Sequence, residues 1–287
     1  MHYSMRFYRH FVSAWLHSPF RDVQINAAVL KRIKTHPIPQ KRYAVFFTAR
    51  SGASWLTDAV EAAGVLGAPG EYFNPDFVPT NAQAFSATDI RSYVELLMRA
   101  RGRHGIFGAE ITYSHLRALF RSEARFLEIF SPTSHLWLIR EDPIAQAVSL
   151  ARMQQTRVAH AVHTSAEAQA RAESSFTYDA RSISGALHRL MWEEDRLEAM
   201  ICRYDLQPLR LSYEGIMSRP KSEVIARIGA HVGVPLTDQV DAPINHERLT
   251  GTKAAVFADQ FRSEHRKLVA RLDRRRAARL AALHMSS

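Results

Sequence analysis

Cysteine, long apolar runs and lysine are all scarce in this sequence. Cys202 is the only cysteine among the 287 residues, which excludes a disulfide framework and a structural zinc site built from several thiolates. No apolar run approaches the roughly 18 residues that a membrane-spanning helix needs. Hydrophobic residues make up 46% of the chain and charged residues 23%, a globular composition that excludes collagen-like and disordered chains.

Arginine takes the place of the missing lysine. Of the 38 basic residues, 32 are arginine and 6 are lysine, and the formal net charge is +10. The guanidinium group is a planar fork of donors that suits phosphate, sulfate and carboxylate. The excess favours an anionic ligand, and it is equally what high-GC codon usage produces without functional pressure.

The first 41 residues are predicted to form a helical arm that ends at the turn-like segment 36–39. In residues 1–20 basic side chains interrupt the apolar ones, and no small-residue cleavage site follows, which argues against a signal peptide. An amphipathic helix here would contact a membrane surface, a partner or its own domain. We expect a cytoplasmic protein, with peripheral contact at the inner face of the membrane as an option.

Residues 42–287 are predicted to form a single α/β domain with an arginine-rich helical tail. Apolar runs typical of buried parallel strands alternate with segments of helical periodicity. The expected strands are 43–47, 105–111, 135–140 and 208–213, and the expected helices are 55–63, 89–101, 115–130, 144–156, 180–204, 220–232 and 257–285. This alternation predicts a central, mainly parallel sheet flanked by helices, with ligands at the carboxyl ends of the strands.

The clearest functional signal is the polar loop 48–54, which lies between the first expected strand and the next helix. Its small residues let backbone N–H groups approach an anion, and the helix N-terminus adds partial positive charge. Ser51 and Ser54 add hydroxyl groups, and Arg50 adds a full charge. The loop therefore predicts a phosphate cradle, with an ordinary strand–helix connection as the alternative. It lacks the GxxxxGK[ST] pattern of a Walker A loop, which disfavours a nucleotide kinase or GTPase.

The segment TARSGASWL, residues 48–56, resembles the 5′-phosphosulfate-binding loop of sulfotransferases that use 3′-phosphoadenosine 5′-phosphosulfate (PAPS). The resemblance is to the bacterial trehalose sulfotransferase family in particular. GAPGEYF (67–73), LIREDPIAQAVSL (138–150) and LSYE (211–214) are similar to later segments of that family, in the same order. The resemblance implies a P-loop-like sulfotransferase fold and sulfuryl transfer from PAPS, without a metal, to a hydroxyl of a carbohydrate or glycolipid.

The resemblance also implies roles for single residues. Arg140 and Ser149 would hold the 3′-phosphate of the donor, and Glu71 occupies the position of the family's proposed general base. Arg50 would be catalytic as well, because it can stabilise charge on the departing phosphate. The residues that would surround the 5′-phosphosulfate are Thr48, Arg50, Ser51, Gly52, Ala53, Ser54 and Trp55.

Four positions depart from the family pattern: Ala49, where proline is common, Ala53, where a hydroxyl or small residue is usual, Glu110 and Glu141. Glu141 lies eight residues before Ser149, where the superfamily usually has a basic residue. Either Arg140 or another arginine would therefore contact the 3′-phosphate. Glu110 stands where relatives often carry lysine, which affects the expected acceptor pocket more than the donor site.

Histidine offers two further candidates. His160 and His163 are three residues apart and could share a helix face. No third ligand is evident nearby, so we expect no metal site. His115 is near the expected acceptor pocket and is an alternative general base.

Other conspicuous residues have structural interpretations. We expect Trp137 and Trp192 to lie in the core, with Glu193 and Glu194 on the solvated face beside Trp192. Cys202 is expected to be a buried, inert thiol. The tail arginines are expected to form a solvated helix face, with an anionic glycan, a lipid surface or a partner as the alternative. They are Arg262, Arg266, Arg271, Arg274, Arg275, Arg276 and Arg279.

Two other function classes stay open at this point. A nucleotide-dependent phosphotransferase would require Mg²⁺ and ATP, and a noncatalytic polyanion-binding protein would bind more weakly as salt rises. The ordered series of sulfotransferase-like segments favours the sulfotransferase. We expect no nucleic-acid partner, and the family resemblance favours a homodimer.

Overall fold

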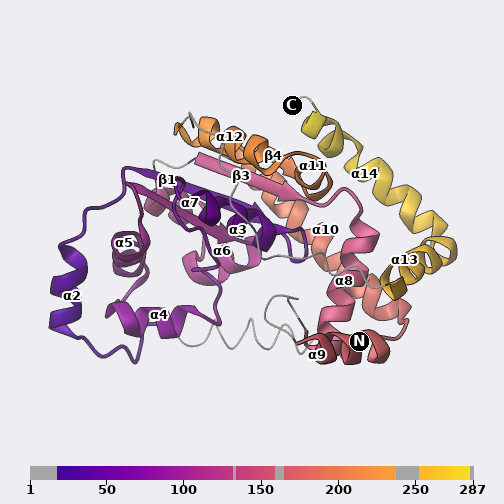
Figure 1. The fold of residues 1–287 in the computed structure, drawn as a ribbon, viewed down its shortest axis with the longest axis horizontal. Helices are drawn as coiled ribbons and strands as arrows, with labels where there is room; N and C mark the ends of the chain where they lie inside the picture. The colour runs from indigo at the N-terminus through magenta and orange to yellow at the C-terminus, as the bar shows by residue number, and fades with distance from the viewer. Residues whose placement is uncertain (1–17, 132–133, 159–164, 235, 237–251, 285–287) are drawn as a thin grey trace.

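A computed structural model describes residues 18–131, 134–158, 165–234, 236 and 252–284. Its sheet has four strands, β1 (Lys41–Phe47), β2 (Ile106–Ile111), β3 (Ser134–Ile139) and β4 (Leu209–Ser212). They pair in the order β2-β1-β3-β4, and each pair is parallel. The predicted α/β fold with a parallel central sheet is therefore confirmed (Figure 1).

Helices surround this sheet and mostly match the expected segments. They are α2 (Ala27–Lys34), α3 (Ala53–Ala63), α4 (Val78–Phe85), α5 (Ile90–Arg101), α6 (Tyr113–Phe120), α7 (Glu123–Phe130), α8 (Pro143–Thr156), α9 (Ala166–Ser175), α10 (Ala180–Arg203), α11 (Tyr213–Met217), α12 (Lys221–Val232), α13 (Thr252–Glu264) and α14 (Arg266–His284). No helix among the described residues is long and apolar enough to cross a membrane. Residues 1–17, which include most of the proposed amphipathic segment, lie outside the described residues.

Two of the expected helices are each divided into two shorter helices. The segment 115–130 is interrupted at Arg121, which has a left-handed φ of 67°, and Ser122 then caps α7 through its hydroxyl. The tail is interrupted between α13 and α14. The helices α4 and α9 were not predicted.

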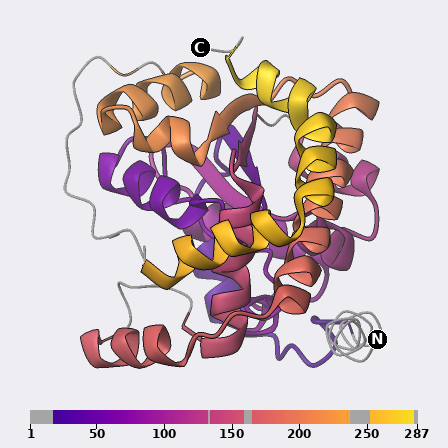
Figure 2. The ribbon, with the colours of Figure 1, turned by 90° about the vertical axis from the view of Figure 1, so that its right-hand side faces the viewer.

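Each face of the sheet has its own hydrophobic core. Phe46 and Trp137 belong to the cluster formed with α5, α6, α7 and α10, whereas Val45 and Leu138 belong to the cluster formed with α3 and α12. A third cluster joins α8, α10, α13 and α14. It lies beside the carboxyl ends of the strands, and Figure 2 shows α13 and α14 from the front. The loops that follow β1 and β3 therefore lie between the sheet and this third cluster.

The prediction of which α10 side chains are buried and which are exposed is wrong. Trp192 is 44% exposed, whereas Glu193 and Glu194 are 4% and 0% exposed. Buried charge is tolerated when it is paired, and both carboxylates have partners: Ser114 donates its N–H and hydroxyl to Glu193, and Arg276 donates to Glu194. Trp137 is buried, as predicted.

Two further surface predictions need correction. Cys202 is exposed rather than buried, because it lies on the solvent side of the last turn of α10. In the tail, Arg271 and Arg274 are exposed as expected, but Arg276 and Arg279 are buried. Both of these guanidinium groups donate to the Glu194 carboxylate, which is what permits their burial.

Candidate functional site

The predicted anion loop joins the end of β1 to the start of α3. Gly52 is the N-cap of α3 and has a left-handed φ of 90°, and no side chain caps the helix. The first backbone N–H groups of a helix have no partner within it, and they point at whatever lies before the helix. Arg50 is also left-handed, with φ 66°, a conformation that is costly for a residue with a side chain and is concentrated at functional sites. The loop therefore has the backbone of an anion cradle.

Gly52 is required by a neighbour as well as by its backbone. A Cβ atom placed there would lie 2.4 Å from Cδ2 of Tyr213, a separation that real contacts do not reach. The Tyr213 ring lies beneath the Arg140 guanidinium group, whose carbon is 4.8 Å from the ring centroid. Tyr213 thus brings the start of α11, the loop and Arg140 together through packing.

Three of the predicted donor-site residues contact one another. The Nε of Arg50 donates to Ser149 Oγ at 3.0 Å, and Nη1 of Arg140 donates to the Arg50 carbonyl oxygen at 3.4 Å. Burial lowers the pKa of Arg50, and the charges of Arg140 and Arg152 lower it further. The two like charges beside Arg50 disfavour its charged form, and an anion between these groups would relieve that repulsion.

Sequence reasoning missed Arg152 and Gln146, which lie on the same side of α8 as Ser149. Gln146 donates through Nε2 to Thr48 Oγ1 and to the Ala49 carbonyl, both at 2.8 Å. Arg152 is held by Glu173 at 3.1 Å. The spacing of three residues from Gln146 to Ser149 to Arg152 was a signal in the sequence, because such residues lie along one side of a helix.

The hydroxyl of Ser51 is the strongest sign of a ligand. Ser51 is fully buried, and its Oγ has no hydrogen-bond partner within the described part of the chain. Buried polar atoms are almost always satisfied, so this hydroxyl is available to a ligand or to a water molecule. Ala53 is buried, while Ser54 and Trp55 are half-buried in the first turn of α3. These residues fit an anionic group such as the phosphosulfate of the donor.

The segment 140–142 after β3 is held firmly by its neighbours. Glu214 accepts the backbone N–H groups of Glu141 and Asp142 at 2.8 and 3.4 Å. The Glu141 carboxylate accepts a hydrogen bond from the Ser212 hydroxyl at 2.5 Å. Glu141 is therefore tied to the end of β4, whereas Arg140 reaches the anion loop.

Two carboxyl groups lie close to one another, one in the edge strand β2 and one in the loop before α4. Glu71 follows α3 in a loop, is half-buried, and accepts a hydrogen bond from Asn74 Nδ2 at 2.9 Å. Glu110 in β2 is 3% exposed, and its backbone N–H donates to the Gly70 carbonyl at 2.9 Å. This bond ties the Glu71 loop to the edge of the sheet.

Burial raises the pKa of both carboxyl groups. For Glu71 the hydrogen bond from Asn74 opposes the effect of burial without cancelling it. For Glu110 burial comes first, and the charge of Glu71 adds to it, which raises the pKa to about 8. A carboxylate with a raised pKa is a better proton acceptor than one in water.

The histidine candidates have different outcomes. His115 lies on α6, and burial together with the charge of Arg189 lowers its pKa to about 4. An imidazole with so low a pKa is a weaker base than Glu71 at neutral pH. His160 and His163 lie outside the described residues. Within the described ranges, no three His, Cys, Asp or Glu side chains form a group that could hold a metal ion.

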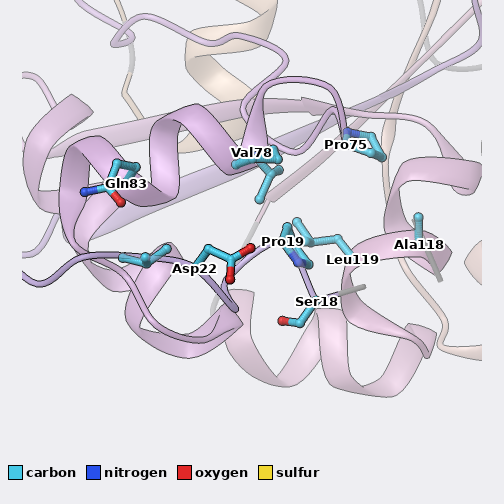
Figure 3. Close-up of a pocket in the computed structure, with 10 residues that line it drawn as sticks. Ser18, Pro19, Asp22, Pro75, Val78, Gln83, Ala118 and Leu119 are labelled. Atoms are coloured by element: carbon cyan, nitrogen blue, oxygen red, sulfur yellow. The ribbon is translucent and has the colours of Figure 1, made fainter. Parts of the chain in front are cut away.

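A separate pocket of about 500 Å³ lies beside α4 and α6 (Figure 3). None of the predicted donor-site residues lines it. Its walls are mostly apolar, and the polar residues among them are Ser18, Asp22 and Gln83. Pro75 lines the pocket and directly follows Asn74, the partner of Glu71. The complete lining is Ser18, Pro19, Asp22, Val23, Pro75, Val78, Pro79, Gln83, Ala118 and Leu119.

A four-strand parallel sheet flanked by helices is consistent with the α/β fold of the sulfotransferase superfamily. The family model described as Stf0 sulphotransferase matches residues 42–264. The chain belongs to this family, the trehalose sulfotransferase family within that superfamily. No curated protein matches the chain.

Proposed function

We propose that this enzyme transfers a sulfuryl group from PAPS to a hydroxyl group of a carbohydrate or glycolipid. Membership of the sulphotransferase family supports the reaction class. The observation that carries the assignment of the donor site is the orphaned, buried Ser51 hydroxyl beside the uncapped start of α3. Half-buried Arg50 adds the positive charge that an anion at this position requires.

The donor would lie across the loop and α8. Ser51, Ser54 and the first N–H groups of α3 would hold the 5′-phosphosulfate, and Arg140 with Ser149 would hold the 3′-phosphate. The contact of Arg50 with Ser149 joins these two parts of the site. When bound, PAPS supplies an activated sulfuryl group, so a metal ion is not needed for activation.

The chemistry proposed for the side chains is simple. Glu71 accepts the proton of the acceptor hydroxyl as its oxygen forms a bond to sulfur. The bond between sulfur and the phosphate oxygen breaks, and Arg50 with the loop amides stabilises the charge left on the phosphate. A carboxylate with a raised pKa suits the first task, and the half-buried guanidinium group of Arg50 suits the second.

The acceptor would enter from the side of Glu71. The half-exposed Glu71 and the nearby mostly apolar pocket that begins at Pro75 favour an acceptor with a sugar hydroxyl and an apolar surface. The resemblance to trehalose sulfotransferases supports a carbohydrate. The homodimer, the cytoplasmic location, the membrane contact and the domain boundary near residue 41 stay predictions.

Calorimetric binding tests the donor assignment. We expect 3′-phosphoadenosine 5′-phosphate to bind the wild type more tightly than adenosine 5′-phosphate, which lacks the 3′-phosphate. Arg50→Ala should weaken binding of the first ligand roughly tenfold to a hundredfold, the loss expected for charge-assisted hydrogen bonds. Arg91→Ala is the control, because Arg91 pairs with Glu128 at the surface. Equal binding of both nucleotides by the wild type would overturn the assignment.

A further inference from the structure

Arg276 is the most deeply buried arginine of the tail. It lies in α14, beyond residue 264 where the family match ends, and is 1% exposed. Its Nη1 donates to the Glu141 carbonyl at 2.7 Å, and its Nη2 donates to the Arg140 carbonyl at 2.6 Å. Its Nε and Nη2 also donate to the Glu194 carboxylate, each at 3.0 Å. One guanidinium group thus joins α10 to the segment that follows β3.

These contacts complete the support of a short backbone segment. Glu214 accepts the N–H groups of Glu141 and Asp142, while Arg276 satisfies the carbonyls of Arg140 and Glu141. Arg262 adds a contact from α13, donating to Asp142 Oδ2 at 2.5 Å. Charge-assisted hydrogen bonds are strong where water is excluded, so the backbone of this segment is fixed on both its donor and its acceptor sides.

The fixed segment carries the side chain of Arg140 toward the anion loop. From this backbone the guanidinium group extends over the Tyr213 ring and donates to the Arg50 carbonyl. The same guanidinium group lies 3.7 Å from a carboxylate oxygen of Glu214. The backbone from which this side chain starts is held in part by Arg276, which lies beyond the residues 42–264 of the family match.

We infer that Arg276 is a positioning residue for the donor's 3′-phosphate, acting through the backbone of Arg140. The inference rests on the proposed function, because it takes Arg140 as a ligand of that phosphate. Arg276 does not itself touch the donor. A buried ion pair with Glu194 that only stabilises the fold is the competing explanation, and the two explanations differ in what they predict for nucleotide selectivity.

The test compares two neighbouring arginines of α14. Arg276→Lys keeps the charge but loses the fork that contacts two carbonyls and a carboxylate at once. Arg275→Lys is the matched control, because Arg275 is exposed and pairs with Asp195 of the same helix α10. Binding of 3′-phosphoadenosine 5′-phosphate and of adenosine 5′-phosphate is measured by calorimetry for each variant and the wild type.

We expect Arg276→Lys to weaken binding of the 3′-phosphorylated nucleotide by roughly tenfold, which is equivalent to the loss of one charge-assisted hydrogen bond. The affinity of Arg276→Lys for the nucleotide without the 3′-phosphate should change by less than about twofold. Arg275→Lys should leave the affinities for both nucleotides unchanged. In an Arg140→Ala background, Arg276→Lys should have no further effect on selectivity, since residues that act through one another are not additive.

Each other outcome has a separate meaning. Equal weakening of both nucleotides, or unchanged selectivity, assigns Arg276 a purely structural role and overturns the inference. A wild type with no preference for the 3′-phosphate overturns the donor assignment first. If Arg276→Lys does not fold, Arg276→Gln, which still donates to one carbonyl, is measured against the same criteria.

Discussion

One side of the candidate site carries arginine side chains and the other carries carboxyl groups, and the two sides are constructed differently. On the donor side burial and the charges of Arg140 and Arg152 depress the pKa of Arg50, and hydrogen bonds between distant segments hold Arg50 and Arg140 in place. On the acceptor side Glu71 and Glu110 are carboxyl groups whose pKa values are raised by burial. The donor side uses fixed charge to bind, whereas the acceptor side uses desolvation to keep a group able to accept a proton.

Breaking the acceptor side should have the largest effect. Glu71→Gln removes the proton acceptor and keeps the hydrogen-bonding shape, so we expect kcat/KM to fall by roughly a hundredfold to ten-thousandfold. Affinity for 3′-phosphoadenosine 5′-phosphate should stay within about twofold, because the donor side is intact. The control is Glu61→Gln, at an exposed surface pair with Arg103. Turnover that survives in Glu71→Gln would move the base elsewhere, to His115 first.

Breaking the donor side through its backbone should have the next largest effect. Gly52→Ala adds a Cβ to a residue with φ 90° and places it against Tyr213, which should cost roughly 2–5 kcal/mol of stability. Urea unfolding measures the loss, and calorimetry measures the accompanying loss of nucleotide affinity.

Gly64→Ala separates the two causes. Gly64 caps the other end of α3 with φ 74°, and nothing lies within 4 Å of its added Cβ. Gly64→Ala should lower the free energy of unfolding by about 1–3 kcal/mol through backbone strain alone, and it should leave nucleotide binding unchanged. An equal loss in both variants would show that the Tyr213 contact contributes nothing.

The smallest expected effect is on the pH dependence of stability, which reports the ionisation of Glu110 on the acceptor side. Burial raises the pKa of Glu110 from its ordinary value of 4.5 to about 8 in the folded protein. Between these two pH values the folded protein therefore holds a proton that the unfolded chain has released. The stability contribution of that proton is complete below about pH 4.5 and is lost as pH rises toward 8.

Glu110→Gln removes this titration. We expect the variant to gain stability relative to the wild type between pH 6 and pH 7, by about 1–2 kcal/mol, because each pH unit between the two pKa values is worth about 1.4 kcal/mol. Urea unfolding at the two pH values provides the measurement, and Glu95→Gln, at a partly exposed pair with Arg99, is the control. A difference that is independent of pH would mean that Glu110 is ionised in the folded state throughout.

The strands and the anion loop could be predicted because their signals are local. A strand covered on both faces must be apolar along its length, as in Tyr43 to Phe47. A loop that admits an anion must use small residues, as at Gly52. The break between α6 and α7 also had a local signal in Ser122, whose hydroxyl caps α7, but the helical periodicity on either side concealed it.

The paired charges of the core could not be predicted from periodicity. Glu194 and Arg276 are 82 positions apart in the chain, and nothing in either local pattern indicates the other. Taken alone, each charged residue is expected at the surface. The same reasoning predicted Trp192 in the core because it is aromatic. The partners that bury Glu193 and Glu194 instead lie elsewhere in the chain.

The contacts of Arg276 also have a consequence for the order in which the protein is completed during synthesis. The carbonyls that it satisfies precede it by 135 and 136 residues. Domains emerging from the ribosome build their local contacts first, and pairings this distant in sequence form late. The sheet can pair while the chain is still growing. The segment that aims Arg140 acquires its last partner only after α14 has emerged, so nucleotide selectivity would be one of the last properties that the nascent chain gains.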